Sequence, residues 1–298
     1  MSSKSVLEHF TVPDDFQNGN TFKGKCMHCG TLISGSYKVT SNFVTHMKIV
    51  VGIVGGKDAK IEDFPYVAQI QQREKQKDPW TNFCTAVILS EDWIITSALC
   101  LIAPMINRRV LAGFVDISDP NKQIRTIKHV KRHPHFDRKF KIDKDDAVFE
   151  NDIAVLELDT PFTFGPTCNK LPYSTSKDVV DKNRCRISGW GRIDINLTAA
   201  EILQYTDISV LTLDECDQLT EAPLVNSQIC AIDKNLEKQA CYGDGGGPLT
   251  CLAGKTRVLC GLFSWLYTFC DGDNPFAYTN VTHYASWIKR ETGIEGFP

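Results

Sequence analysis

Ten cysteines spread between Cys84 and Cys270 constrain the fold of this chain more than any other feature of its sequence. Cysteines distributed in this way are typical of a disulfide framework, which persists in oxidising compartments. Two further cysteines, Cys26 and Cys29, form an isolated Cys-x-x-Cys pair of the kind that binds metal. The two groups indicate different environments, and we expect the chain to divide near residue 50.

Length and charge narrow the remaining possibilities. A chain of 298 residues accommodates one large or two modest domains, and roughly 75% of the unfolded surface can be buried at this size. The net charge of −3 gives no bulk attraction to nucleic acid or to an anionic membrane. No apolar run approaches the ~20 residues of a membrane-spanning helix. Residues 1–25 contain no apolar stretch of signal-peptide length, so the N-terminus does not support the secretion that the cysteines predict.

From residue 65 onward the pattern predicts an all-β fold. Short runs rich in Val, Ile, Leu and aromatic residues alternate with clusters of Asp, Asn, Gly, Pro and Lys, a spacing that favours a sandwich or barrel. The runs are Tyr66–Gln71, Cys84–Leu89, Trp93–Ser97, Ile153–Leu158, Ile202–Leu211 and Val258–Trp265. Near the C-terminus Tyr284, Trp287 and Ile288 follow helical spacing, and Thr282 is placed to cap the start. This predicts an amphipathic helix over residues 283–291.

Six short motifs occur in a fixed order along the β-rich region. They are Ile53-Val54-Gly55-Gly56, Thr96-Ser97-Ala98-Leu99-Cys100, Asn151-Asp152-Ile153-Ala154, Ser188-Gly189-Trp190-Gly191, Cys241-Tyr242-Gly243-Asp244-Gly245-Gly246-Gly247-Pro248 and Ser264-Trp265. In this order they resemble the landmarks of the chymotrypsin/trypsin family of serine proteases, over residues 53–288. The resemblance implies two packed six-stranded antiparallel β-barrels with a C-terminal helix, in a domain spanning residues 53–298.

The resemblance carries the family's catalytic triad onto three positions. A serine hydroxyl becomes a nucleophile when a histidine takes its proton, and an aspartate orients that histidine. The histidine position here is Leu99, the serine position is Gly245, and only the aspartate is retained, as Asp152. Because leucine accepts no proton and glycine has no side chain, we expect a non-catalytic protein in which Ser264 hydrogen-bonds a buried Asp152. His133 and His135, on a surface segment before Asp152, are not expected to substitute.

The resemblance also places an oxyanion hole and a specificity pocket. Gly243 stands at the oxyanion position. Gln239 replaces the aspartate that trypsin-type members carry at the base of the pocket. Leu266 and Phe276 stand where the family usually has glycines that open the pocket wall. We therefore expect these two apolar side chains to fill the slot that would receive a substrate side chain.

Activation of family members pairs the new amino group of Ile-Val-Gly-Gly with the aspartate before the nucleophile. Ile53 and Asp244 match that pair. Cleavage by a trypsin-like activator needs Arg or Lys before Ile53, but Gly52 stands there and the nearest upstream basic residue is Lys48. We expect Asp244 to lack its cationic partner and the neighbouring loops to stay zymogen-like.

The family pattern assigns four disulfides and leaves two cysteines over. The assigned bridges are Cys84–Cys100, Cys185–Cys251, Cys216–Cys230 and Cys241–Cys270. Cys168 and Cys260 remain, and a fifth bridge between them is the expectation.

Residues 1–50 resemble a BED-type zinc finger, a nuclear DNA-binding module. The resemblance rests on Ser5-Val6-Leu7-Glu8-His9-Phe10, Lys25-Cys26-Met27-His28-Cys29-Gly30 and Thr40-Ser41-Asn42-Phe43-Val44-Thr45-His46-Met47-Lys48. Cys26, Cys29 and His46 match three zinc ligands, but Val50, Val51 and Gly52 occupy the place of the fourth. Structural zinc takes four ligands, so we expect weak binding. The alternative is a disordered leader with two incidental cysteines.

Three interpretations of function follow. The first is a non-catalytic serine protease homologue that binds a protein partner, namely a protease, an inhibitor or a surface ligand. The second is a residual trypsin-like endopeptidase, and the third is a nuclear DNA-binding protein. We expect no cofactor for the protease-like domain, zinc only in residues 1–50, and no membrane partner. The cysteines favour an extracellular location, whereas the N-terminal segment favours the nucleus.

Overall fold

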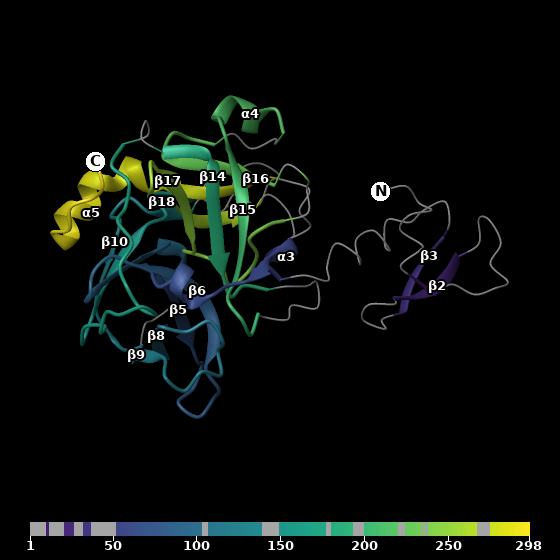
Figure 1. Ribbon diagram of the computed structural model, residues 1–298, viewed down its shortest axis with the longest axis horizontal. Coiled ribbons are helices and arrows are strands. Elements are labelled where there is room, and N and C mark those ends of the chain that lie inside the picture. Colours follow the sequence, from purple (N-terminus) through teal and green to yellow (C-terminus); the bar gives the residue numbers. More distant parts are fainter. Residues whose placement is uncertain are drawn as a thin grey trace.

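A computed structural model of the full 298-residue chain provides the fold. The structure describes residues 52–102, 107–138, 149–176, 180–192, 200–219, 224–233, 235, 238–266 and 275–298, together with the backbone of three earlier strands. Figure 1 shows two β layers, one above the other, with the C-terminal helix α5 (Ala285–Thr292) along one side.

The earlier strands form a small antiparallel sheet of their own. They are β1 (Phe10–Thr11), β2 (Thr21–Cys26) and β3 (Leu32–Ser36), in the order β1-β2-β3. Cys26 is the last residue of β2, whereas Cys29 and His46 lie outside the described residues. The zinc site and the domain boundary near residue 50 therefore stay predictions.

The lower layer in Figure 1 is a seven-stranded antiparallel sheet in the order β10-β13-β7-β6-β5-β8-β9. Its strands are β5 (Val67–Gln72), β6 (Thr81–Ile88), β7 (Trp93–Thr96), β8 (Arg108–Ala112), β9 (Gln123–Arg125), β10 (Ile127–Arg132) and β13 (Ala154–Leu158). The two edges, β9 and β10, are separated only by Thr126. They belong to one bent segment, which pairs with β8 on one side and with β13 on the other, and no ladder joins β9 to β10 among the described strands.

This sheet is therefore a half-barrel, and the expectation of two closed six-stranded barrels is corrected to one. The upper layer does close. Its strands are β14 (Val180–Gly189), β15 (Gln204–Leu211), β16 (Gln228–Ile232), β17 (Pro248–Ala253), β18 (Thr256–Leu266) and β19 (Phe276–Asn280). They follow the order β14-β17-β18-β19-β16-β15, and an additional ladder between β14 and β15 completes the barrel. The short β4 (Lys57–Asp58) extends it beside β15.

Short elements connect these strands. They are α3 (Gly52–Gly55), η1 (Ile61–Asp63), η2 (Ala98–Leu101), the pair β11 (Asp137–Arg138) and β12 (Phe149–Glu150), α4 (Leu213–Asp217) and η4 (Val281–Tyr284). Each predicted strand overlaps an observed one, and the C-terminal helix is confirmed. Its predicted cap is wrong: the 3-10 turn η4 leads into α5, so Tyr284 takes the N-cap position without a side-chain bond.

The main core lies between the two layers and positions the helix. Phe114 from the lower layer stacks on Trp190 from the upper one, with ring centroids 4.8 Å apart. Trp287 and Ile288 of α5 are buried in the same cluster, as their helical spacing predicts. Within the described residues, the structure has no helix with the length and apolarity needed to cross a membrane.

Candidate functional site

Asp152 is a buried carboxylate at the turn before β13, held by three protein hydrogen bonds. Ser264 donates its hydroxyl to one carboxylate oxygen at 2.6 Å, and the backbone N–H of Leu99 donates to the other at 2.7 Å. Thr279 donates to the Asp152 carbonyl at 2.7 Å. Burial raises the pKa of Asp152 to about 6, and the hydrogen bonds from Ser264 and Leu99 oppose that rise. The predicted contact between Ser264 and Asp152 is present.

Leu99 and Gly245 lie against the same disulfide. Leu99 precedes Cys100 on η2, and a Cβ added to Gly245 would stand 3.3 Å from the Cys84 Sγ and 3.4 Å from the Cys100 Sγ. Folding thus brings the three triad positions together across the two layers. They carry one carboxylate, one isobutyl side chain and one hydrogen atom. Asp152 accepts the backbone N–H of Leu99, whose side chain offers no proton acceptor.

Asp244 is the second buried carboxylate of the site. It accepts hydrogen bonds from the backbone N–H groups of Gly191 at 2.7 Å and Cys241 at 2.9 Å. Burial raises its pKa to about 6, and these two bonds lower it. Among the described residues no cationic side chain pairs with it. Ile53 is buried in the closed barrel, and its pairing with Asp244 stays a prediction.

Glycines shape the space around Asp244. A Cβ on Gly189 or on Gly191 would overlap the Asp244 carboxylate, so only glycine fits on either side of Trp190. Gly243, at the oxyanion position, has a φ of 98°, a conformation that favours glycine, and its carbonyl accepts from the Thr85 hydroxyl at 3.3 Å. We had not assigned a role to Gly189 or Gly191. The Ser-Gly-Trp-Gly motif was the signal that could have found them.

The residues of the predicted specificity pocket lie in the core of the closed barrel. Phe276 is fully buried, and its ring centroid lies 6.3 Å from that of Phe263 and 5.8 Å from that of Tyr278. Leu266 stands opposite Phe276 in the β18–β19 ladder and packs against the same cluster. Gln239 is fully buried as well. The pocket role of these residues remains a proposal.

Three of the expected disulfides are present. They are Cys84–Cys100, Cys185–Cys251 and Cys216–Cys230. Cys241 is also disulfide-bonded, and its expected partner Cys270 lies outside the described residues. These bridges fit an extracellular location.

The expected fifth disulfide is wrong, because Cys168 and Cys260 are free, buried thiols. Cys168 belongs to the core of the half-barrel and Cys260 to that of the closed barrel, so packing separates them. Burial raises the pKa of Cys168 to about 11 and that of Cys260 to about 12.

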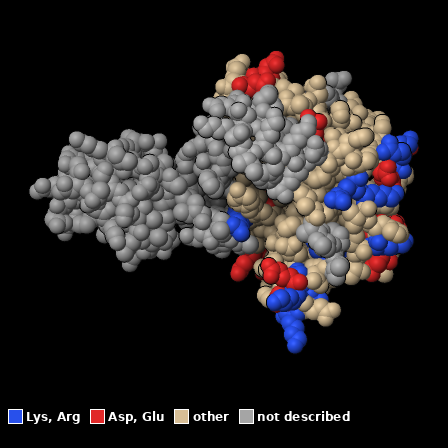
Figure 2. All heavy atoms as spheres, turned by 180° about the vertical axis from the view of Figure 1, so that it is seen from behind, with Lys and Arg blue, Asp and Glu red and all other residues tan. Residues whose placement is uncertain are grey.

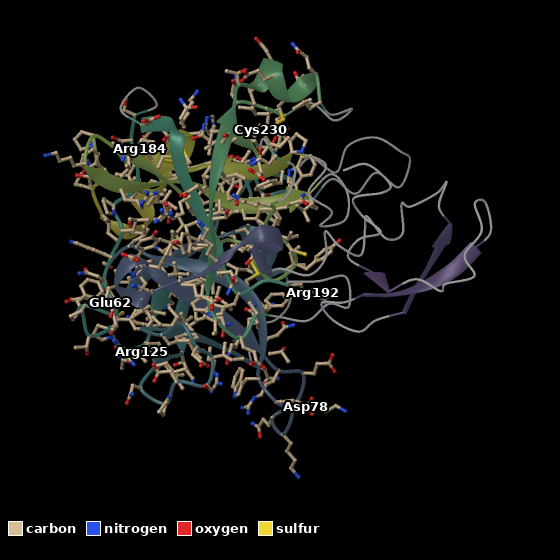
Figure 3. All side chains as sticks on the ribbon, turned by 45° about the vertical axis from the view of Figure 1, so that its right-hand side comes forward. Glu62, Asp78, Arg125, Arg184, Arg192 and Cys230 are labelled. Atoms are coloured by element: carbon tan, nitrogen blue, oxygen red, sulfur yellow. A yellow bond between two sulfur atoms is a disulfide. The ribbon has the colours of Figure 1, made fainter. Side chains whose placement is uncertain are left out.

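An arginine and a tyrosine form the rim of the site near Gly243. The Arg192 guanidinium lies 5.9 Å from the centroid of the Tyr242 ring, and the Arg192 N–H donates to the Tyr242 carbonyl at 2.7 Å. In Figure 3, Arg192 lies between Cys230 of the closed barrel and Asp78 of the half-barrel. The sequence motifs did not predict this pair. Within the described residues, no group of three or more His, Cys, Asp or Glu side chains could hold a metal ion.

A closed β-barrel and a half-barrel that enclose an aspartate between Leu99 and Ser264 define a protein of the chymotrypsin-like serine protease class. The family model described as Trypsin matches residues 53–288, and this chain belongs to that family.

The curated relatives agree with this assignment. The chain is 32% identical to fibrinolytic enzyme, isozyme C, of Lumbricus rubellus over 248 residues, which cover 79% of this chain and 98% of the relative. It is 29% identical to granzyme M of Homo sapiens over 266 residues, covering 88% and 95%. It is 30% identical to mast cell protease 3 of Ovis aries over 240 residues, covering 80% and 88%.

These relatives contradict the expectation that the chain is not an enzyme. They are named as a fibrinolytic enzyme, a granzyme and a mast cell protease at 29–32% identity, and they point to a trypsin-like serine endopeptidase. The substitutions at Leu99 and Gly245 do not by themselves establish a loss of activity, and we correct the expectation accordingly.

Proposed function

We propose that this chain acts as a protein-binding, regulatory member of the trypsin family, through the face that receives protein substrates and inhibitors in that family. The observation that carries the proposal is the environment of Asp152. One of its oxygens is taken by the Ser264 hydroxyl and the other by the Leu99 N–H. The carboxylate ties the two layers together, and this preserves the shape of the face.

The rim near Gly243 supplies anchors for a partner. Tyr242 is 52% exposed, and Arg192 covers its ring. Tyrosine and arginine are enriched at the energetically dominant positions of protein interfaces. The stacking and the backbone hydrogen bond order both side chains before binding, which lowers the entropic cost of association. We propose Tyr242 and Arg192 as contacts to the partner.

The buried pocket residues bear on how the partner binds. In our proposal Phe276 and Leu266 fill the slot that would receive a long side chain, above Gln239. Phe276 is fully buried and packs on Phe263 and Tyr278, so it cannot move aside without opening a cavity in the barrel. The partner would therefore be held by the surface rim rather than by an inserted Arg or Lys.

A second candidate is endopeptidase activity, which the names of the relatives favour. It requires a nucleophile and a proton acceptor at positions other than Gly245 and Leu99. Two measurements separate the candidates: labelling by a fluorophosphonate probe under conditions that label trypsin, and reversible capture by an immobilised protein inhibitor of serine proteases. Covalent labelling with cleavage of a protein substrate would establish the endopeptidase. Capture without labelling, weakened by Tyr242→Ala and by Arg192→Ala, would support the binding module, and neither labelling nor capture would refute both.

For the N-terminal segment we propose zinc binding through Cys26, Cys29 and His46. The position of Cys26 at the end of β2 supports it, because a strand end holds a ligand in a defined place. With three ligands the site should be weak. A zinc titration of the full chain should show tighter binding after Val51→His, and an unchanged affinity would argue against the finger and its DNA partner.

A further inference from the structure

A groove of about 730 Å³ lies between β10 and the C-terminal helix α5. Lys131, Arg132 and His133 line it from β10 and the turn that follows. Trp287, Arg290 and Glu291 line it from α5. We call it the β10–α5 groove. In Figure 2, basic side chains with a few acidic ones among them gather along the right-hand edge, the side on which α5 lies.

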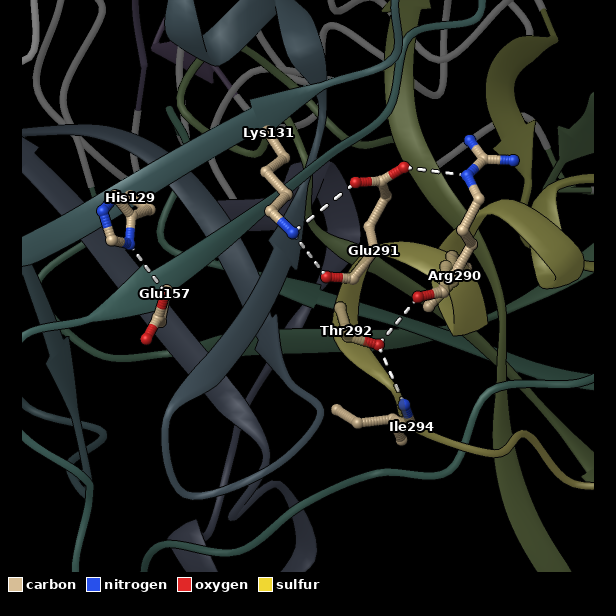
Figure 4. A network of polar contacts seen from close by, with 8 residues as sticks. His129, Lys131, Glu157, Arg290, Glu291, Thr292 and Ile294 are labelled. Carbon is tan, nitrogen blue, oxygen red and sulfur yellow. Dashed lines mark hydrogen bonds and ion pairs between the residues drawn. The ribbon is translucent and has the colours of Figure 1, made fainter.

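The fixed charges of the groove leave an excess of positive charge. Glu291 accepts from the Arg290 Nε at 3.0 Å, and its carboxylate lies 3.6 Å from the Lys131 Nζ, which also donates to the Glu291 carbonyl at 2.8 Å (Figure 4). Among the described residues Arg132 has no carboxylate partner. Lys131, Arg132 and Arg290 carry three positive charges against the one negative charge of Glu291, so the groove is already net positive at neutral pH and attracts anions.

The histidines supply the charge that can change. All four histidines after residue 52, namely His129, His133, His135 and His283, lie on β10, on the turn after it or on η4. The His133 ring packs 5.8 Å from that of His135 and 5.3 Å from that of Trp287. Histidine is the side chain whose charge changes most readily near neutral pH, so protonation here would add positive charge to this face.

His133 differs from the other three because it lines the groove itself. Burial lowers its pKa, and the neighbouring His135, Arg290 and His283 lower it further, while Glu291 opposes them. Its Nδ1 also accepts a long 3.4 Å hydrogen bond from the His135 backbone N–H, which a protonated Nδ1 could not accept. An anion in the groove would offset this repulsion and raise the pKa. Anion binding is therefore linked to proton uptake and becomes tighter as pH falls.

His129 is set apart from this group. Its Nδ1 lies 2.8 Å from the carboxylate of Glu157 on β13 (Figure 4). Lys128 contacts the same carboxylate at 2.7 Å, and His129 does not line the groove. It can therefore serve as a matched control for His133, because both are histidines of the same edge segment.

We propose that the β10–α5 groove is a docking site for an acidic peptide segment of a partner protein, and that it binds more tightly at acidic pH. A peptide fits the lining better than a sulfated polysaccharide does. Apolar side chains of Val130, Pro134, Phe136 and Trp287 line the groove beside the cationic ones, and an acidic peptide, unlike a sulfated polysaccharide, can bring apolar side chains beside its carboxylates. The proposal goes beyond the function of the Asp152 face, since none of these residues belongs to that site.

The test measures binding of a rhodamine-labelled peptide, in which Asp and Glu alternate with Phe, to the full chain at pH 7.5, 6.5 and 5.5 and constant ionic strength. We expect the dissociation constant to fall about tenfold or more over this range, as linkage to one or more protons requires. His133→Gln should remove most of the pH dependence, whereas His129→Gln should leave it. Glu291→Gln, which removes the internal counter-charge, should tighten binding at pH 7.5.

Two results would overturn the proposal. One is an affinity for the peptide that stays the same at all three pH values and is not altered by His133→Gln. The other is a sulfated oligosaccharide that binds more tightly than the peptide, because the apolar lining would then have no role. If His133→Gln does not fold, as judged by circular dichroism, the test rests on Glu291→Gln. This variant must then bind the peptide more tightly than the parent at pH 7.5. A failure of inhibitor capture at the Asp152 face would leave this test unaffected.

Discussion

The hydroxyl of Ser264 on β18 donates a 2.6 Å hydrogen bond to the fully buried carboxylate of Asp152, which precedes β13. The bond joins the closed barrel to the half-barrel. Bonds to charged groups contribute about 1.5–3 kcal/mol, and a buried carboxylate left without one is costly. The stability of the interface between the layers therefore depends on a polar group that lies in its interior.

Ser264→Ala should lower the free energy of unfolding by about 1.5–3 kcal/mol at pH 8. The loss should be smaller at pH 5, because the pKa of Asp152 is about 6 and the carboxyl is then mostly protonated. Urea denaturation at both pH values measures this. Ser90→Ala removes a hydroxyl bound to the surface residue Asp92 and should show no such difference between the two pH values. An equal loss for Ser264→Ala at both values would contradict the prediction.

Asp152→Asn should flatten the dependence of stability on pH. The pKa of Asp152 is raised from 3.8 to about 6 in the folded state, so the folded chain binds more protons than the unfolded chain between these values. Stability contributed by this group is therefore present at low pH and is lost as pH rises through about 6. An amide keeps an acceptor for Leu99 and a donor for Ser264, so the variant should be more stable than the parent at pH 7.5, by on the order of 1–2 kcal/mol.

Asp244→Asn is the matched control for that substitution. Both Asp244 oxygens accept backbone N–H groups, from Gly191 and Cys241, so an amide NH₂ would face a donor. This variant should be less stable than the parent at pH 7.5, and a gain in stability would show that the donor geometry does not matter.

Gly245→Ser should be tolerated, whereas Gly246→Ser should not. A Cβ at Gly245 meets two sulfur atoms at 3.3 Å and 3.4 Å, a contact that a small shift relieves. At Gly246 the φ is 73° and a Cβ would overlap the Thr96 hydroxyl. We expect a loss below about 1 kcal/mol at Gly245 and several kcal/mol at Gly246, measured by denaturation. Similar losses at the two positions would contradict the geometry.

Alkylation of the denatured, unreduced protein should label Cys168 and Cys260. The cysteines at 84, 100, 185, 216, 230, 241 and 251 should react only after reduction. In the folded protein Cys168 and Cys260 should react slowly, because burial raises their pKa values to about 11 and about 12. Peptide mapping by mass spectrometry reads this out, and a peptide linking Cys168 to Cys260 would refute it.

Leu99→His combined with Gly245→Ser should raise hydrolysis of a small ester more than hydrolysis of an Arg or Lys peptide. The double variant supplies a base and a nucleophile beside Asp152, but in our proposal the buried Phe276 still fills the slot that would receive a substrate side chain. Poor positioning of the scissile bond can cost about a hundredfold. The ratio of kcat/KM for the two substrates, before and after substitution, measures the effect. Ordinary protease rates on the Arg peptide would show that the pocket is open.

Much of the fold could be predicted because its signals are local. The alternation of apolar and polar residues located the strands, and the motifs around Asp152 and Cys241 located the site. The positions of Leu99 and Gly245 and three of the disulfides followed from the same motifs. The presence or absence of a nucleophile, a base or a cysteine can be derived from the sequence, because it depends only on which residue occupies a position.

Only the tertiary structure decided what depends on distance between remote segments. It closed one barrel through the β14–β15 ladder, whereas no ladder joins the edge strands β9 and β10 of the other sheet among the described residues. It placed Cys168 and Cys260 in separate cores. It also brought His133 on the β10 side against Trp287 of α5, far along the chain. Such contacts arise from packing of whole layers, and the residues that meet carry no local pattern that names their partner.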